Sequence, residues 1–135
     1  MVICLDASCI ISLIERTPIW SPKVVARLAQ ASAAGDTLAA CDLARAECLV
    51  GPLQQGKTAL AADFQRFFAS GMVAMLPLAP EVCERAAAIR ATSATQIKLP
   101  DALHLAAAAA HGCGLFLTSD VALGRTTVLP VEVLS

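Results

Sequence analysis

The sequence predicts an α/β fold in three layers, with helices on both faces of a mostly parallel central sheet. Short apolar runs, typical of buried strands, alternate along the chain with longer segments in which apolar residues recur about one helical turn apart. No repeat, linker or low-complexity tract interrupts this alternation. A chain of 135 residues can bury one substantial core, so we expect residues 1–135 to form a single domain.

The first half of the chain predicts two strands that each end beside an acid. The apolar run from Val2 to Leu5 stops at Asp6, and a weaker run from Thr37 to Cys41 stops at Asp42. Helical periodicity follows each run, with capping residues, Pro and Gly at the boundaries. The helices expected here are one capped by Ser8 and ended by Pro18, one from Pro22 to Gly35, one from Asp42 to Gly51, and one from Gly56 to Ser70.

The second half predicts three more strands, separated by two helices. Pro100 suits the first turn of a helix, where its missing N–H costs nothing, and Gly112 suits the position just past the last turn. Pro130 is tolerated only if the last strand lies at an edge of the sheet. The expected elements are a strand from Met72 to Leu78, a helix from Glu81 to Ala94, a helix opened by Pro100 and stopped at Gly112, a strand from Leu115 to Leu117, and an edge strand from Val128 to Val133.

Four carboxylates come from separate segments but share one expected location. Asp6 ends the first strand and Asp120 follows the fourth. Glu47 lies about one turn into the helix after the second strand, and Asp101 lies in the first turn of the helix before the fourth. In a doubly wound sheet the carboxyl ends of the strands and these helix ends lie along one edge, where ligands bind. We therefore expect the four acids to converge there.

Such a cluster is unfavourable without a cation. Two carboxylates about 4 Å apart repel by roughly 4 kcal/mol at an effective dielectric constant of about 20. Oxygen ligands that leave room for water suit Mg²⁺ or Mn²⁺ rather than zinc. A site of this kind supports hydrolysis of a phosphodiester, because the metal activates a bound water and screens the charge that builds on the phosphate.

The composition limits which classes of partner and which cellular compartment we expect. The net charge is −1, so local Arg and Lys side chains would have to hold a nucleic acid. A hydrophobic content of 57% with 16% charged residues leaves apolar surface, which favours a dimer or a tight protein partner. The six Cys form no CxxC pair, which indicates buried free thiols in a reducing cytoplasm. No basic leader precedes Asp6, and the longest uncharged stretch is mostly Ala, so we expect no targeting segment and no membrane span.

Three segments resemble the PIN-domain ribonucleases, specifically the VapC-type toxins. They are LDASCIISLIE at the start, LARAECLVGPL in the middle, and KLPDALHLA with LFLTSD near the end. The resemblance covers essentially the whole chain in order and spacing, and it implies an RNA endonuclease that depends on Mg²⁺ or Mn²⁺. It implies a catalytic acidic quartet of Asp6, Glu47, Asp101 and Asp120, with metal held by Asp6, Asp101 and Asp120. It also implies a homodimer and a cognate VapB-type antitoxin, whose C-terminal segment occupies the groove beside the acids.

Two features depart from the pattern that the resemblance implies. Ser8 stands where the family has Thr or Ser beside the metal, but Ser119 stands where many members have Asn. This change would alter the hydrogen bonds around the ligands and leaves the carboxylates in place. The segment VALGRTT after Asp120 lacks a further acid that some relatives carry, so one metal ion or two both stay open.

Other polar residues have plainer interpretations. His104 follows Asp101 by three positions, and we interpret it as a packed residue that hydrogen-bonds locally rather than as a general base, because a metal-bound water needs none. Each quartet acid could alternatively be a helix cap, a turn former or a solvated charge. The candidates for phosphate contacts, each also an ordinary surface charge, are Lys98, Arg16, Arg45, Arg90 and Arg125, with Lys98 the best placed.

Two other functions stay open at this stage. A catalytically idle PIN-like module that binds RNA or a protein would show the same quartet. A phosphohydrolase of another doubly wound family, acting on small phosphate esters, is less favoured because the residues after Asp6 are Ala-Ser-Cys-Ile, with no second Asp two positions on to protonate a leaving group.

Overall fold

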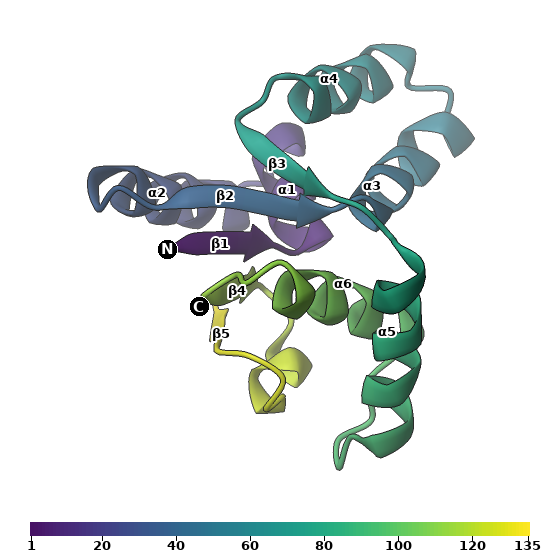
Figure 1. Cartoon of the computed structure of the whole chain (residues 1–135). Coiled ribbons are helices and arrows are strands. Elements are labelled where there is room, and N and C mark those ends of the chain that lie inside the picture. The colour runs from purple at the N-terminus through teal and green to yellow at the C-terminus, as the bar shows by residue number, and fades with distance from the viewer.

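A five-stranded sheet runs through the centre of the computed structural model, which describes residues 1–135 (Figure 1). Every neighbouring pair of strands is parallel, in the order β3-β2-β1-β4-β5. The strands are β1 (Val2–Leu5), β2 (Thr37–Cys41), β3 (Val73–Leu76), β4 (Leu115–Thr118) and β5 (Val131–Val133). The chain adds β2 and β3 on one side of β1 and then β4 and β5 on the other. The switch point of this topology therefore lies between β1 and β4, and ligands of such sheets bind at the carboxyl ends of the strands beside it.

Helices cover both faces of the sheet, which confirms the predicted three-layer α/β/α architecture. They are α1 (Ala7–Glu15), α2 (Trp20–Ala33), α3 (Leu43–Gln54), α4 (Thr58–Ala69), α5 (Pro80–Thr92) and α6 (Leu99–Ala110), with a short 3₁₀ helix η1 (Val121–Arg125). Residues of α1 to α4 pack on one face and residues of α5 and α6 on the other. None of the six α-helices is both long enough and apolar enough to cross a membrane.

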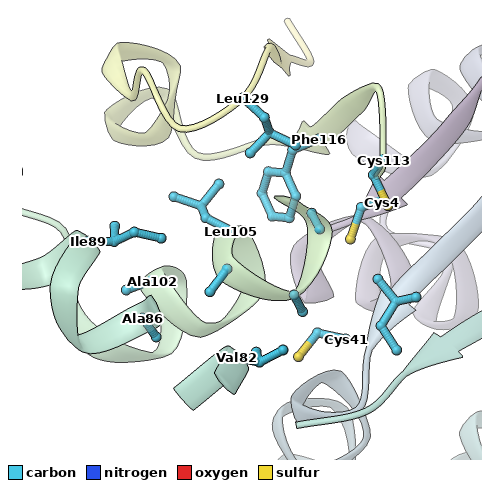
Figure 2. Close-up of a cluster of buried hydrophobic side chains, with 14 of the residues drawn as sticks. Cys4, Cys41, Val82, Ala86, Ile89, Ala102, Leu105, Cys113, Phe116 and Leu129 are labelled. Carbon is cyan, nitrogen blue, oxygen red and sulfur yellow. The ribbon is translucent and has the colours of Figure 1, made fainter. Parts of the chain in front are cut away.

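The two cores follow from the alternation of side chains along β1. Ile3 and Leu5 point into the core under α1 to α4, whereas Cys4 points into the core under α5 and α6. Figure 2 shows the second core, in which Leu105 of α6 and Phe116 of β4 lie together. A strand buried on both faces has to be apolar throughout, as the short runs of the sequence indicate.

Helix α6 packs on the sheet through a buried side in which small residues flank His104 and Leu105. Ala102, Ala106 and Ala107 are fully buried, so the helix axis can approach the strands closely. The helix ends as predicted: Gly112 adopts a φ of +71°, and the Cys113 N–H bonds to the Ala108 carbonyl. The first turn of α6, which carries Asp101, lies near Asp6 and Asp120 at the carboxyl edge of the sheet.

Several boundaries differ from the predictions. Helix α1 starts at Ala7, so Ser8 does not cap it; the Asp6 carbonyl accepts the first helical bonds directly after the strand. Helix α3 continues through Pro52 to Gln54, and helix α2 starts before Pro22, which lies in its first turn, where a missing N–H is harmless. Asp42 precedes α3 as expected, but its carboxylate pairs with Arg45 at 2.9 Å and caps nothing. Strand β5 is shorter than expected and spans Val131–Val133.

Candidate active site

Asp6 is the most enclosed acid at the carboxyl edge of the sheet. It follows β1, is 7% exposed, and its N–H bonds to the Leu117 carbonyl at 2.9 Å. Its Oδ2 atom accepts two hydrogen bonds, from Thr118 Oγ1 at 2.6 Å and from Ser8 Oγ at 3.2 Å. No protein group bonds to Oδ1. The carboxylate is therefore oriented through one oxygen, and the other remains available to a ligand.

Thr118 connects Asp6 to Asp120, and sequence reasoning missed it. The same hydroxyl that donates to Asp6 accepts the Asp120 N–H at 3.0 Å. The predicted hydrogen-bonding residue, Ser119, contributes only its backbone N–H, 3.4 Å from Ser8 Oγ. Pairing of β1 with β4 in the register Leu5 to Leu117 places residue 118 beside Asp6. The sequence signal that could have identified Thr118 is a polar residue at the end of an apolar strand, two positions before Asp120.

Asp120 is the exposed member of the acidic quartet. It follows β4 and precedes η1, and its Oδ1 accepts the Ala122 N–H at 3.0 Å. The side chain therefore does cap a turn after the strand, as one of the plainer interpretations held. This bond leaves Oδ2 without a protein partner, so the capping role does not exclude a second one.

The pKa of Asp101 depends on burial and on the charges of the other acids. Asp101 lies half-buried in the first turn of α6. Burial raises the pKa of its carboxyl above the ordinary value, and the charges of Asp6 and Asp120 raise it further. Glu47 adds a smaller increase, while His104 acts in the opposite direction. The quartet therefore shares one electrostatic environment, although its members are distributed over most of the chain.

Glu47 approaches this environment from α3 and is bonded to His104. Its side chain is 34% exposed, and Oε1 lies in a short contact with His104 Nε2. The imidazole is 1% exposed, so the expectation that His104 is a packed residue is confirmed. Its hydrogen-bonding partner, however, is 57 residues away in the chain rather than local.

The chemistry of the donors fits a hard divalent cation. The quartet supplies carboxylate oxygens, and the hydroxyls of Ser8 and Thr118 lie beside Asp6. The nearby thiols are poor ligands: burial and then the charge of Asp6 raise the pKa of Cys9 to about 12. No three His, Cys, Asp or Glu side chains stand close enough to hold an ion as they are placed. The acids would therefore have to move closer together to share an ion, and the bonds of Glu47 to His104 and of Asp120 to the Ala122 N–H each leave one carboxylate oxygen without a protein partner.

The basic candidates fall into two groups. Arg45 pairs with Asp42, and Arg90 donates to the Ile97 carbonyl at 2.6 Å, so both have partners within the fold. Arg16 is exposed at the end of α1, on a left-handed backbone with φ +56°. Lys98, which precedes α6, and Arg125, which ends η1, are exposed, and their side chains have no hydrogen-bond or ion-pair partner. Arg125 lines a groove of about 400 Å³ together with Thr95, Gln96, Val121 and Ala122.

Several solved structures share this fold. VapBC2 from Rickettsia felis, bound to a DNA fragment from its promoter, matches with a TM-score of 0.81 at 16% identity, covering 100% of both chains. A toxin–antitoxin complex from Klebsiella pneumoniae matches with a TM-score of 0.71 at 20% identity, over 96% of this chain and 94% of that one. FitAcB from Neisseria gonorrhoeae matches with a TM-score of 0.72 at 19% identity, over 96% and 95%. At these identities the likeness establishes the fold.

Sequence comparisons identify the family. No curated protein matches the chain significantly. The family model described as the PIN domain matches residues 3–129, which include the whole acidic quartet, β1 apart from Val2, and all elements from α1 to η1. The chain therefore belongs to the PIN-domain family.

Proposed function

We propose that the protein is a Mg²⁺- or Mn²⁺-dependent endoribonuclease that acts as the toxin of a VapBC-type toxin–antitoxin pair, with residues 1–135 as one nuclease domain. The single observation that carries the proposal is the position of the acids at the carboxyl edge of the sheet: Asp6 is held through Oδ2 with Oδ1 unpartnered, and the charges of Asp6 and Asp120, after burial, raise the pKa of Asp101. Carboxylates that raise one another's pKa repel each other, which destabilises the folded protein. A bound dication would remove this repulsion. PIN domains are a family of nucleases, which gives this arrangement a chemical purpose.

Each residue of the site has a proposed task. Asp6, Asp101 and Asp120 hold the metal, and Glu47 either joins them or orients the attacking water. When bound, the ion lowers the pKa of a coordinated water and neutralises charge on the phosphate. Thr118 and Ser8 keep Asp6 in one orientation, with its Oδ1 available. Because water and not the ribose 2′-hydroxyl attacks, the products expected are a 3′-hydroxyl and a 5′-phosphate.

Phosphate contacts come from the basic residues beside the acids. Lys98 and Arg125 are exposed and form no salt bridge or hydrogen bond through their side chains, so they are free to meet an RNA backbone. Arg16 is exposed as well, but it lies at the end of α1 that is far from Asp6. Arg45 and Arg90 are weaker candidates because each already has a partner.

A VapB-type antitoxin and a second copy of the chain are the proposed protein partners. The solved structures that share the fold include toxin–antitoxin complexes. Large apolar side chains stand in solvent, among them Ile19, Leu53, Met72 and Val121, which are 61% to 75% exposed. Surfaces of this kind favour burial against a partner. Free thiols, five of them buried, suit a reducing cytoplasm as the compartment.

Incubation of purified protein with RNA tests the proposal. Cleavage should occur with Mn²⁺ or Mg²⁺, stop with EDTA, and be lost in Asp6→Asn at unchanged circular dichroism. Cleavage by Asp6→Asn at the rate of the wild-type protein would refute the assignment of the site. RNA binding without cleavage in any metal would indicate the alternative, a catalytically idle PIN module.

A further inference from the structure

His104 contacts Glu47, one of the four acids of the candidate site, through its Nε2 atom. We infer that His104 is a positioning residue for Glu47: its Nε2–H holds one carboxylate oxygen, so that the other is presented at the site. The inference rests on the proposed function, since it concerns how one acid of the proposed metal site is placed. It differs from a general-base role, because His104 acts through Glu47 and need not touch the substrate.

His104 is a rigid point of attachment. The ring is 1% exposed and lies in the core on the α5 and α6 side of the sheet, tilted by 47° against Phe116 with 6.4 Å between ring centroids. Its neighbour Leu105 is fully buried as well. A ring enclosed in close-packed surroundings keeps one rotamer, so the direction in which Nε2 points is set by the core.

Glu47, in contrast, has no other support. Asp6 is oriented by Thr118 and Ser8, and Asp120 by the Ala122 N–H, but the only hydrogen bond of the Glu47 side chain is the one to His104. A Glu side chain has several rotatable bonds and loses considerable freedom when it is ordered. Without His104, Glu47 would spend much of its time in solvent, away from the other acids.

The unpartnered Nδ1 of His104 indicates that the hydrogen bond between His104 and Glu47 does not serve stability alone. This atom is buried and has no hydrogen-bond partner. In the tautomer that donates from Nε2, Nδ1 is a bare acceptor in the core, which destabilises the fold relative to an apolar residue of similar size. Because the unsatisfied Nδ1 does not stabilise the fold, a role other than stability explains why a His lies here. Orientation of Glu47 is such a role.

The same ring also relates Glu47 to Asp101. His104 follows Asp101 by three positions, so both lie on neighbouring parts of the α6 surface. Glu47 belongs to α3, on a different segment of the chain. The imidazole therefore brings Glu47 to the helix that carries Asp101.

Two substitutions separate positioning from packing. His104→Leu fills much of the ring volume but has no donor, whereas His104→Gln places an amide donor near the position of Nε2. Loss of a group that orients a metal ligand typically lowers affinity or activity 10- to 100-fold. We expect a loss of about this size in kcat and in Mn²⁺ affinity for His104→Leu, and substantial recovery of both in His104→Gln.

A double-mutant cycle with Glu47→Gln completes the test. If His104 acts through Glu47, the double variant His104→Leu/Glu47→Gln should be no worse than Glu47→Gln alone, in cleavage and in Mn²⁺ binding measured by calorimetry. Losses that multiply independently would overturn the inference, as would equal defects in His104→Leu and His104→Gln.

The outcomes also distinguish this inference from the proposed function. If the wild-type protein binds Mn²⁺ but cleaves no RNA, the nuclease proposal fails, while the cycle measured on Mn²⁺ binding still decides the role of His104. If the wild-type protein cleaves RNA and His104→Leu does so equally well, the inference on His104 fails and the nuclease proposal stands.

Discussion

The hydroxyl of Thr118 donates to the carboxylate of Asp6 over 2.6 Å, and both side chains are buried where β1 and β4 end. These residues are 112 positions apart in the chain, yet they are neighbours at the switch point of the sheet. The hydrogen bond joins the first and fourth strands at the point where the candidate site begins. It also orients the acid on which the proposed metal site is centred.

Thr118→Val tests this hydrogen bond, because Val has the shape of Thr without the hydroxyl. Hydrogen bonds to charged groups contribute roughly 1.5–3 kcal/mol, so we expect the free energy of unfolding to fall by about that amount at neutral pH. Urea denaturation measures it. Thr118→Ser keeps the hydroxyl and should recover most of the loss. If Val and Thr give the same stability, Asp6 does not depend on this donor.

Asp101→Asn tests the electrostatic cost of the quartet. Since the folded protein raises the pKa of Asp101, the native state binds its proton more tightly than the unfolded chain does. Stability in metal-free buffer should therefore fall as the pH rises through the interval between the ordinary and the raised pKa, and it should stay lower above that interval. Asp101→Asn removes this penalty, so the variant should be more stable than the wild-type protein at neutral pH.

The advantage of Asp101→Asn should disappear in acid and reverse with metal. Below the ordinary carboxyl pKa both states of the wild-type protein are protonated at Asp101, so the difference between the two proteins should vanish. Added Mn²⁺ should stabilise the wild-type protein and leave the variant nearly unchanged. Glu84→Gln, an exposed acid on α5, is the matched control and should show neither effect. An Asp101→Asn variant that is less stable at neutral pH without metal would contradict the account.

Lys98→Ala and Arg90→Ala should affect different properties. Lys98 is exposed beside the quartet and has no partner, so its loss should weaken RNA binding for all sequences alike. The slope of log affinity against log salt should become shallower by about 0.7, as for one phosphate contact on a single strand. Fluorescence anisotropy at several salt concentrations, in the Asp6→Asn background to prevent cleavage, measures the slope.

Arg90→Ala serves as the comparison. Its guanidinium donates to the Ile97 carbonyl, so we expect about 1 kcal/mol of lost stability and little change in the salt slope. If the Arg90 variant loses as much of the slope as the Lys98 variant, RNA lies across α5 rather than along the edge where α6 begins.

The sequence predicts the layers and the location of the acids because both depend on local patterns. The run from Val2 to Leu5 and the run that starts at Leu115 are short, apolar and followed by Asp, and strands of this kind are buried in parallel sheets. Once the strands are known, the acids that follow them must lie on one edge. The boundaries were less accurate, as Pro52 inside α3 illustrates, because tertiary packing overrides local helix signals.

The hydrogen-bonded pairs could not be predicted in the same way. Thr118 becomes the partner of Asp6 only because β1 and β4 pair in one register, and one sequence contains no record of that register. His104 meets Glu47 because α3 and α6 approach each other, and the angle between two helices depends on side chains throughout their interface. Interactions across the chain that depend on such geometry require coordinates.

Mn²⁺ binding measured by calorimetry tests the central claim most directly, namely that acids from separate segments are arranged to share a divalent cation. The wild-type protein should bind Mn²⁺, and Asp6→Asn and Asp101→Asn should each bind at least about tenfold more weakly while remaining folded, in line with the effect of losing a group that supports a metal site. Equal Mn²⁺ affinity in all three proteins, or no binding by the wild-type protein, would contradict the account.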